Sequence, residues 1–147
     1  MDTIIIRHVE SNDFFKGHLD LCAQLSHLDT SSISFDSYNE FVNTLKYGHG
    51  HHEVHVVEMD GKIVGTVTLL IETKLIHNMG KVAHVEDLVV DKNYRQHGLG
   101  KMLIQHAVAC AKSNNCYKVI LDCNDENVGF YQKCEFEKLG NMMAIYF

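Results

Sequence analysis

The sequence has no proline, and it shows no internal repeat, low-complexity tract or linker-like stretch. Nothing in it therefore marks a boundary between two domains. A chain of 147 residues, of which 46% are hydrophobic and 22% charged, has the size at which one domain buries a core without disulfides or metals. We expect a single domain over residues 1–147.

Long hydrophobic runs are missing as well. No stretch approaches the roughly 18 consecutive apolar residues of a membrane-spanning helix. The first residues, MDTIIIRHVESND, have too short an apolar run and too many charges for a secretory signal peptide. We expect no membrane partner and an intracellular protein, in the cytoplasm or, as an open alternative, in an organelle.

The cysteines lack the spacing of a disulfide framework or a zinc ribbon. Their number is odd, and no CxxC pair occurs. The set consists of Cys22, Cys110, Cys116, Cys123 and Cys134. We interpret all of them as reduced thiols, and Cys123 as a core thiol rather than a nucleophile, because no triad spacing accompanies it.

Positive charge is scarce, with 13 Lys and Arg against 19 Asp and Glu and a formal net charge of -6. This balance argues against nucleic acid as a partner, because binding to a phosphate backbone requires a basic face. A polyanionic small molecule would instead need a local group of cations. Lys92, Arg95 and Lys101 form such a group around two glycines.

Hydrophobic periodicity predicts the elements of the first half of the chain. TIIIR is typical of a strand. Two helical patterns follow, one capped by Ser11 or Asp13 and the other by Ser34 or Asp36. The strands EVHVVEM and KIVGTVTLLIE come next, and the Asp-Gly pair between them predicts a hairpin turn.

The second half predicts a strand-helix-strand unit. VAHVEDLVV and YKVILDC read as strands, with a helix from about Leu99 to Ser113 between them. NDENVGFYQKC continues as a helix, and FEKL and MMAIYF are expected to close the sheet. The order β-α-α-β-β-β-α-β-α-β-β predicts an α/β (α+β) fold with a mixed, mostly antiparallel sheet flanked by helices.

The turn RQHGLG before the predicted long helix combines three features of an anion site. Gly98 and Gly100 allow close approach to the backbone, Arg95 adds charge, and the helix start offers unpaired N–H groups. The dinucleotide fingerprint GxGxxG and the P-loop pattern are both absent. On the residues alone, the alternative is an ordinary tight turn whose glycines only permit positive φ angles.

Read as Arg-x-x-Gly-x-Gly between a β-rich run and an amphipathic helix, this turn resembles the pyrophosphate-binding turn of the GCN5-related N-acetyltransferases (GNAT), which hold acetyl-CoA. With HVEDLVVDKNYRQHGLGKMLI and CYKVILDCNDENVGFYQKCEF, the chain is similar to the eukaryotic glucosamine-6-phosphate N-acetyltransferases over residues from about 56 to 138. The resemblance implies the GNAT fold and acetyl-CoA as co-substrate.

The activity implied by this resemblance is direct transfer of the acetyl group to the 2-amino group of glucosamine 6-phosphate, a step toward UDP-GlcNAc, without a metal or a covalent intermediate. The backbone of Leu88, Val89 and Val90 is expected to contact the pantetheine arm and the thioester oxygen. Further contacts to the co-substrate are implied for Arg95, Gln96, His97, Gly98, Leu99, Gly100, Lys101 and Asn127.

Three residues match the catalytic groups of the family. Tyr131 is implied to protonate the leaving thiolate, although a tyrosine at helical spacing also fits a core position. Glu86 and Asp122 are implied to orient the amine and to accept its proton, and Asp87 to contact the sugar. Solvated strand ends remain the alternative for these carboxylates, which are costly to bury without partners.

For the sugar phosphate, the resemblance implies Lys74, His77 and Lys118. It also implies a homodimer, in which an arginine of the last strand reaches the phosphate across the interface. This chain has Ile145 and Tyr146 at those positions, which leaves phosphate binding open. The competing functions are acetylation of another amino sugar, a polyamine or a peptide, and a non-catalytic CoA-binding module.

The segment HGHHEVH contains His49, His51, His52 and His55. HxH pairs are able to bind metals. The segment also fits a solvated loop that leads into a strand, and the chemistry implied by the resemblance needs no metal. We therefore expect no metal site.

Overall fold

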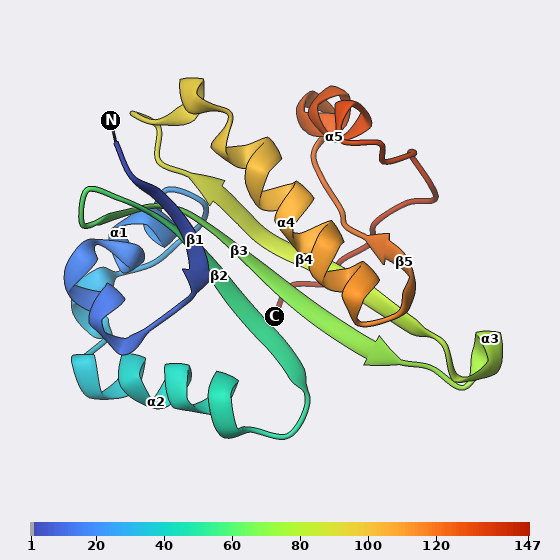
Figure 1. Cartoon of the computed structure of the whole chain (residues 1–147), viewed down its shortest axis with the longest axis horizontal. Helices are drawn as coiled ribbons and strands as arrows, with labels where there is room; N and C mark the ends of the chain where they lie inside the picture. The colour runs from blue at the N-terminus through green and yellow to red at the C-terminus, as the bar shows by residue number, and fades with distance from the viewer. Residues whose placement is uncertain (1) are drawn as a thin grey trace.

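The computed structural model describes residues 2–147. A single five-stranded sheet has the order β1-β2-β3-β4-β5 (Figure 1). The strands are β1 (Ile4–His8), β2 (His51–Met59), β3 (Lys62–Thr73), β4 (Lys81–Val90) and β5 (Cys116–Ile120). The first three pairings are antiparallel, whereas β4 and β5 are parallel. The predicted α+β class with a mostly antiparallel sheet is confirmed.

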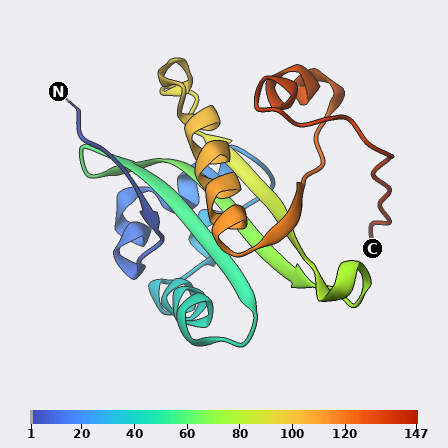
Figure 2. The ribbon, with the colours of Figure 1, turned by 45° about the vertical axis from the view of Figure 1, so that its right-hand side comes forward.

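Helices cover both faces of this sheet (Figures 1 and 2). The α-helices are α1 (His18–Ala23), α2 (Phe35–Tyr47), the short α3 (Ile76–Met79), α4 (Leu99–Ser113) and α5 (Val128–Lys133). The 3₁₀ helices are η1 (Ser11–Lys16), η2 (Thr30–Ser32), η3 (Arg95–His97) and η4 (Asp125–Asn127). Within residues 2–147 no helix combines the length and the apolarity that crossing a bilayer requires.

The alternation of side chains along the strands produces two separate cores. On one face, Val57 of β2 and Leu69 of β3 pack against α4 residues such as Leu103. On the other face, the neighbouring Val56 joins Leu21 of α1 and residues of α2. The sheet is therefore fully buried at its centre, and β2 carries apolar side chains in both directions.

Local sequence signals account for most element boundaries. Ser34 caps α2 by accepting a hydrogen bond from the Ser37 N–H at 3.1 Å. The predicted Asp-Gly hairpin connects β2 and β3, with left-handed φ angles of 50° at Asp60 and 80° at Gly61. The first predicted helix is interrupted, because Gly17 (φ 85°) separates η1 from α1.

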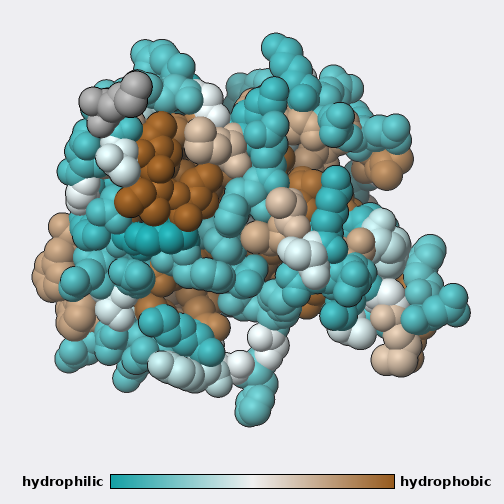
Figure 3. Space-filling model, in the orientation of Figure 1, coloured by the Kyte–Doolittle hydropathy of each residue, from teal (hydrophilic) through white to brown (hydrophobic). Residues whose placement is uncertain are grey.

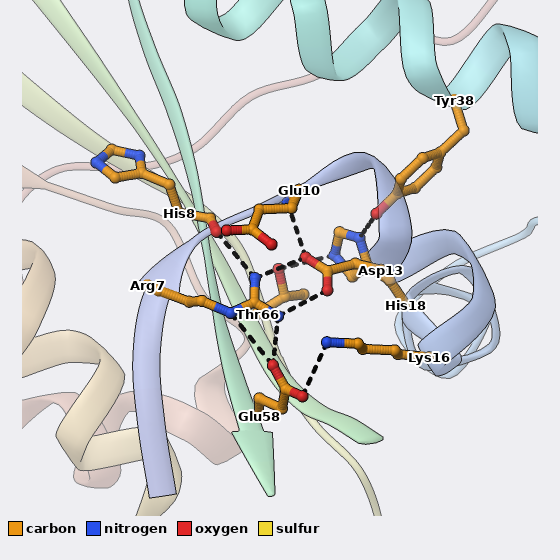
Figure 4. Close-up of polar contacts among 9 residues, drawn as sticks. All are labelled: Arg7, His8, Glu10, Asp13, Lys16, His18, Tyr38, Glu58 and Thr66. Carbon is orange, nitrogen blue, oxygen red and sulfur yellow. Dashed lines mark hydrogen bonds and ion pairs between the residues drawn. The ribbon is translucent and has the colours of Figure 1, made fainter. Parts of the chain in front are cut away.

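A buried ion pair fixes the N-terminal segment to the sheet (Figure 4). Asp13 is fully buried, and its two carboxylate oxygens accept hydrogen bonds from Arg7 at 2.8 and 2.9 Å. The Glu10 N–H donates to the same carboxylate at 2.8 Å. Glu58 of β2 lies between Arg7 and Lys16. Every polar atom of the buried carboxylate thus has a partner.

A second buried chain of hydrogen bonds crosses from α2 to β3 through His18 (Figure 4). The hydroxyl of Thr66 donates to the His55 carbonyl at 3.1 Å, so its oxygen accepts from His18 Nε2–H at 3.0 Å. The remaining nitrogen, Nδ1, accepts from the Tyr38 hydroxyl at 2.6 Å. This pattern requires a neutral imidazole, and burial accordingly lowers the pKa of His18 to about 4.

The prediction of two strands at the C-terminus is wrong for this chain. FEKL and MMAIYF form no strand in the described residues, and the tail runs apart from the sheet (Figure 2). Its apolar side chains are exposed, with Ile145 at 83% and Tyr146 at 92%. A run that is apolar on both faces is stable as a strand only between neighbours that bury it, and the single chain offers none.

Candidate active site

The site is organised by a gap between β4 and β5. The parallel pairing of the two strands covers Lys81–His84 and ends where His84 faces Ile120. Beyond that point β4 pairs only with β3. The strands separate there, and hydrophobic atoms are visible between α4 and the segment from β5 to α5 (Figures 1 and 3).

A β-bulge at Asp87 marks the start of the gap. Asp87 has a left-handed φ of 50°, and the β3–β4 register shifts between Thr66 and Thr68. The extra residue bends the strand. It also places both Val85 and Leu88 on the side of α4, where simple alternation would put them on opposite faces.

Of the three β4 residues whose backbone was expected to contact the pantetheine arm, Leu88 and Val90 direct their backbone groups toward the gap. The Asp91 N–H donates to the Val64 carbonyl at 2.8 Å, so the alternation of the ladder turns the Val89 backbone toward β3 as well. Leu88 and Val90 then point their N–H and C=O groups away from β3. The Val90 carbonyl accepts from Arg95, and the other groups are available to an extended ligand that takes the position of a missing strand.

The glycine turn adjoins the same end of β4. Gly98 has a φ of 69° and precedes α4, and Arg95 ties the turn to the strand by donating to the Val90 carbonyl at 3.3 Å. The N–H groups of residues 98–101 donate to no acceptor within residues 2–147. Four such groups at a helix N-terminus form a site for a phosphate.

The two glycines of this turn have different structural roles. A Cβ at Gly98 would meet no atom within 4 Å, so only its left-handed backbone requires glycine. A Cβ at Gly100 would lie 3.3 Å from the ring of Phe130. Gly100 therefore allows α5 to approach α4. The other predicted residues of the turn, Gln96, His97 and Lys101, are exposed.

Carboxylates from both sides of the gap lie close together. Glu86 on β4 is half-buried, whereas Asp87 and Asp122 are exposed. Burial raises the pKa of Glu86, and the negative charges of Asp122 and Asp87 raise it further. Glu86 is thereby a better proton acceptor than a free carboxylate.

Tyr131 lies on α5 at the other wall of the gap. Its ring packs against Phe130 and Phe136, with centroids 5.0 and 6.0 Å away, and the residue is half-buried. Burial, followed by the nearby Cys123, Cys134 and Asp122, raises the pKa of Tyr131. The hydroxyl therefore keeps its proton at neutral pH and is a hydrogen-bond donor. Asn127, one turn earlier, is exposed.

The residues expected to bind the sugar phosphate lie at the far end of β4. Lys118 pairs with Val82, and the loop with Lys74 and His77 precedes Lys81. From Lys81 to Glu86 the strand rises by about 17 Å. The backbone of this loop therefore lies away from Glu86, although the Lys74 ammonium reaches back to Glu72, whose carboxylate lies 3.0 Å from His84 on β4.

A tyrosine that the sequence did not single out organises this distant group. The ring of His77 stacks on Tyr117 at 4.3 Å, and the Lys118 ammonium lies 5.8 Å from the same ring. Lys74 forms an ion pair with Glu72 at 3.1 Å. Tyr117 directly precedes Lys118 in the sequence. This pair of an aromatic and a basic residue was the signal from which the group could have been predicted.

One prediction about a side-chain environment is wrong: Cys123, expected in the core, is exposed. The histidine segment leads into a strand as predicted, but β2 begins at His51 instead of Glu53, and His55, inside the predicted strand EVHVVEM, is only 2% exposed. The period-2 spacing of His51, Glu53 and His55 was the signal for a shared strand face.

The comparison with known proteins agrees with this geometry. A model of the Acetyltransferase (GNAT) family matches residues 18–136. The chain belongs to this family. The fold and the resemblance inferred from the motifs are thereby confirmed.

Similarity to members of the family covers nearly the whole chain. A glucosamine 6-phosphate N-acetyltransferase of Arabidopsis thaliana is 36% identical over 99% of this chain and 98% of its own length. One from Dictyostelium discoideum is also 36% identical, over 99% and 92%. The likeness thus extends to the N-terminal residues outside the range from about 56 to 138.

Solved structures give the same result. The crystal structure of the Arabidopsis thaliana enzyme superimposes with a TM-score of 0.93 at 36% identity and covers 99% of both chains. A Trypanosoma brucei acetyltransferase superimposes with a TM-score of 0.90 at 30% identity, covering 99% of this chain and 100% of its own. The family fold is therefore present over the full length of the chain.

Proposed function

We propose that this protein transfers the acetyl group of acetyl-CoA to the 2-amino group of glucosamine 6-phosphate. The observation that carries the proposal is the 36% identity over 99% of the chain to relatives from Arabidopsis thaliana and Dictyostelium discoideum that bear the name of this reaction. The products are CoA and N-acetylglucosamine 6-phosphate, the latter a precursor of UDP-GlcNAc.

In this proposal acetyl-CoA lies in the gap between β4 and β5. The free N–H groups from Gly98 to Lys101 bind its pyrophosphate, and Arg95 adds a positive charge beside them. The backbone groups of Leu88 and Val90 pair with the pantetheine arm, and one N–H polarises the thioester carbonyl. Val89 supports the site from the opposite core. Asn127 contacts the co-substrate from the start of α5.

The acidic pair acts on the acceptor. Glu86 and Asp122 hold the substrate ammonium, and Glu86, whose pKa burial raises, accepts its proton directly or through water. The free amine then forms the new N–C bond while the C–S bond breaks. Tyr131 donates its proton to the leaving thiolate. Asp87 contacts the sugar hydroxyls.

We also propose that the protein acts as a homodimer. Strand β5 is an outer strand of the sheet, and the apolar tail up to Phe147 is exposed. An exposed strand edge and an unburied apolar segment are each covered when a second copy adds its tail to the sheet. The backbones of Lys74, His77 and Lys118 lie toward the opposite end of β4 from Val90, and a dimer would bring further groups of a second copy to the sugar phosphate.

We propose the cytoplasm as the compartment, with an organelle as the alternative. All five cysteines are free thiols, which suits a reducing environment. No metal or nucleic acid takes part in the proposed reaction.

The deciding experiment is thiol release from acetyl-CoA with glucosamine 6-phosphate, glucosamine, spermidine and a lysine peptide as parallel acceptors. We expect strong preference for the phosphorylated sugar. Activity on the peptide or spermidine alone would keep the acetyl-CoA site and overturn the acceptor. Binding of CoA without thiol release from any acceptor would favour a non-catalytic CoA-binding module.

A further inference from the structure

Two histidines and a cysteine gather at the contact between β2 and the second half of α4, outside the proposed active site. His106 and Cys110 are one turn apart on α4 and therefore share a face. His106 Nε2 lies 3.0 Å from His55 Nδ1 and 3.6 Å from Cys110 Sγ. The three ligand atoms all lie within 4.8 Å of one another.

These distances match the edges of a tetrahedral zinc site. Zinc binds imidazole nitrogen at about 2.0 Å and thiolate sulfur at about 2.3 Å. For tetrahedral angles, two nitrogens are then about 3.3 Å apart, and a nitrogen and a sulfur about 3.5 Å. The observed nitrogen pair is slightly closer, as expected of two rings that share a hydrogen bond. A small increase in the distance between His55 Nδ1 and His106 Nε2 is enough to admit an ion.

The surroundings of His55 also suit a metal ligand. Its second nitrogen, Nε2, lies 3.3 Å from a carboxylate oxygen of Glu53, and His51 approaches the other oxygen at 3.5 Å. Histidines that bind metals usually donate their second ring N–H to such a carboxylate. Because Nε2–H donates to Glu53, the lone pair of Nδ1 is directed toward His106 and Cys110.

Solvent has access from the side of His8. Its exposed ring lies 4.4 Å from that of His55, measured between centroids. His106 and Cys110 are themselves only half-buried. An ion can therefore reach Nδ1 of the buried His55 from this face of the sheet, and its fourth position is left to water.

We propose that His55, His106 and Cys110 bind one divalent transition-metal ion, with zinc as the best fit. A set of two imidazoles and one thiolate has the softness and number of protein ligands typical of zinc. The ion joins β2 to α4, the helix whose N-terminus borders the acetyl-CoA site. Binding displaces the Cys110 proton to solvent, and no electron is transferred. The ion takes no part in acetyl transfer.

Cobalt(II) titration of the reduced, chelator-treated full-length protein tests the proposal, because tetrahedral cobalt is coloured and a thiolate ligand adds a charge-transfer band. We expect saturation at one equivalent with that band present, and displacement of the colour by zinc. Cys110→Ser should abolish the band. His106→Gln should weaken binding by more than about 10-fold, because loss of even a residue that only supports a metal ligand costs about 10- to 100-fold.

Matched controls come from the same elements. Cys116→Ser alters another half-buried thiol that packs on the same core as Cys110, and it should leave the titration unchanged. His52 lies three residues from His55 on the opposite face of β2, against Phe41. His52→Gln should therefore leave the cobalt titration unchanged as well.

Fold integrity is checked independently by far-ultraviolet circular dichroism of each variant without metal. Zinc should raise the melting temperature of the wild-type protein and of both controls, but not that of Cys110→Ser. The absence of a thiolate band in the wild type, or a band that persists in Cys110→Ser, would overturn the proposal and leave the cluster as a hydrogen-bonded contact between sheet and helix.

Discussion

The N-terminal and C-terminal halves of the molecule treat their polar groups in opposite ways. Around Asp13 and His18 each donor meets an acceptor of the same chain, even in full burial (Figure 4). Around β4 and the start of α4, backbone groups of the same kinds have no partner within the described residues. The first arrangement stabilises the fold, and the second is what a ligand or a second chain requires.

The same contrast holds for apolar surface. Side chains from Val9 to Ile63 that face α1 and α2 are buried in one core. In the tail, Met143, Ile145 and Tyr146 are exposed. Large exposed apolar segments on soluble chains are typical of interaction surfaces. The contrast therefore separates residues whose substitution should reduce stability from residues whose substitution should reduce activity.

The largest expected effect is the loss of the buried ion pair in the N-terminal half. Asp13→Asn removes the charge that neutralises Arg7 and leaves one carboxylate position without an acceptor. We expect a loss of about 3 kcal/mol in the free energy of unfolding, the lower end for breaking a buried pair, since Glu58 still contacts Arg7. Urea unfolding measures it.

Asp20→Asn is the control for this substitution, because Asp20 is exposed on α1. Its stability should lie within about 0.5 kcal/mol of wild type. Equal effects of the two substitutions would contradict the assignment of the N-terminal network to stability.

The next effect is a dependence of stability on pH that originates in His18. Burial lowers its folded-state pKa to about 4, against an ordinary value of 6.5. The charged ring is disfavoured in the folded state, although Asp13 partly offsets this and Arg7 adds to it. The contribution of His18 is therefore complete above pH 6.5 and is lost as the pH falls toward 4, by up to about 3 kcal/mol.

Urea unfolding at a series of pH values, compared between wild type and His18→Gln, isolates this contribution. The variant should be less stable at pH 7 and should lose less stability on acidification. His27→Gln, which alters an exposed histidine, should follow the wild-type curve. Parallel curves for wild type and His18→Gln would show that folding does not lower the pKa of His18.

In the C-terminal half, the expected effect is on turnover. Tyr131→Phe removes one hydroxyl from a half-buried ring and leaves its packing against Phe136 in place. Loss of a proton donor should lower kcat by about 10²-fold, equivalent to about 2.7 kcal/mol. Acetyl-CoA affinity and urea stability should remain near those of wild type. Unchanged kcat would remove Tyr131 from the reaction and leave it as a core residue.

The sequence predicted the elements whose signals are local. The Asp60-Gly61 turn and the bounds of α4 follow from turn chemistry and helical periodicity, and both agree with the structure. The gap between β4 and β5 was implied by the resemblance alone. Its cause, the bulge at Asp87, depends on pairing with β3 and leaves no trace in composition or period.

The errors have a physical cause in tertiary context. MMAIYF has the composition of a buried strand, but strand formation requires a neighbour that this chain alone lacks. The role of His55 was missed because its partners, His8 and His106, lie 47 and 51 residues away in the sequence. Only the fold brings these rings together at the β2–α4 contact.

The smallest expected effect distinguishes backbone strain from ligand contact in the glycine turn. Gly98→Ala places a Cβ in open space but keeps the left-handed φ of 69°, which should cost about 1 kcal/mol of stability. If strain opens the turn, the KM for acetyl-CoA should rise more than kcat falls. Gly129→Ala is the control: it lies within α5 with no atom near its added Cβ, and should stabilise by about 0.5 kcal/mol. A Gly98→Ala protein as stable and as active as wild type would show that the turn needs neither this backbone conformation nor glycine. It would also contradict the assignment of the turn to acetyl-CoA binding.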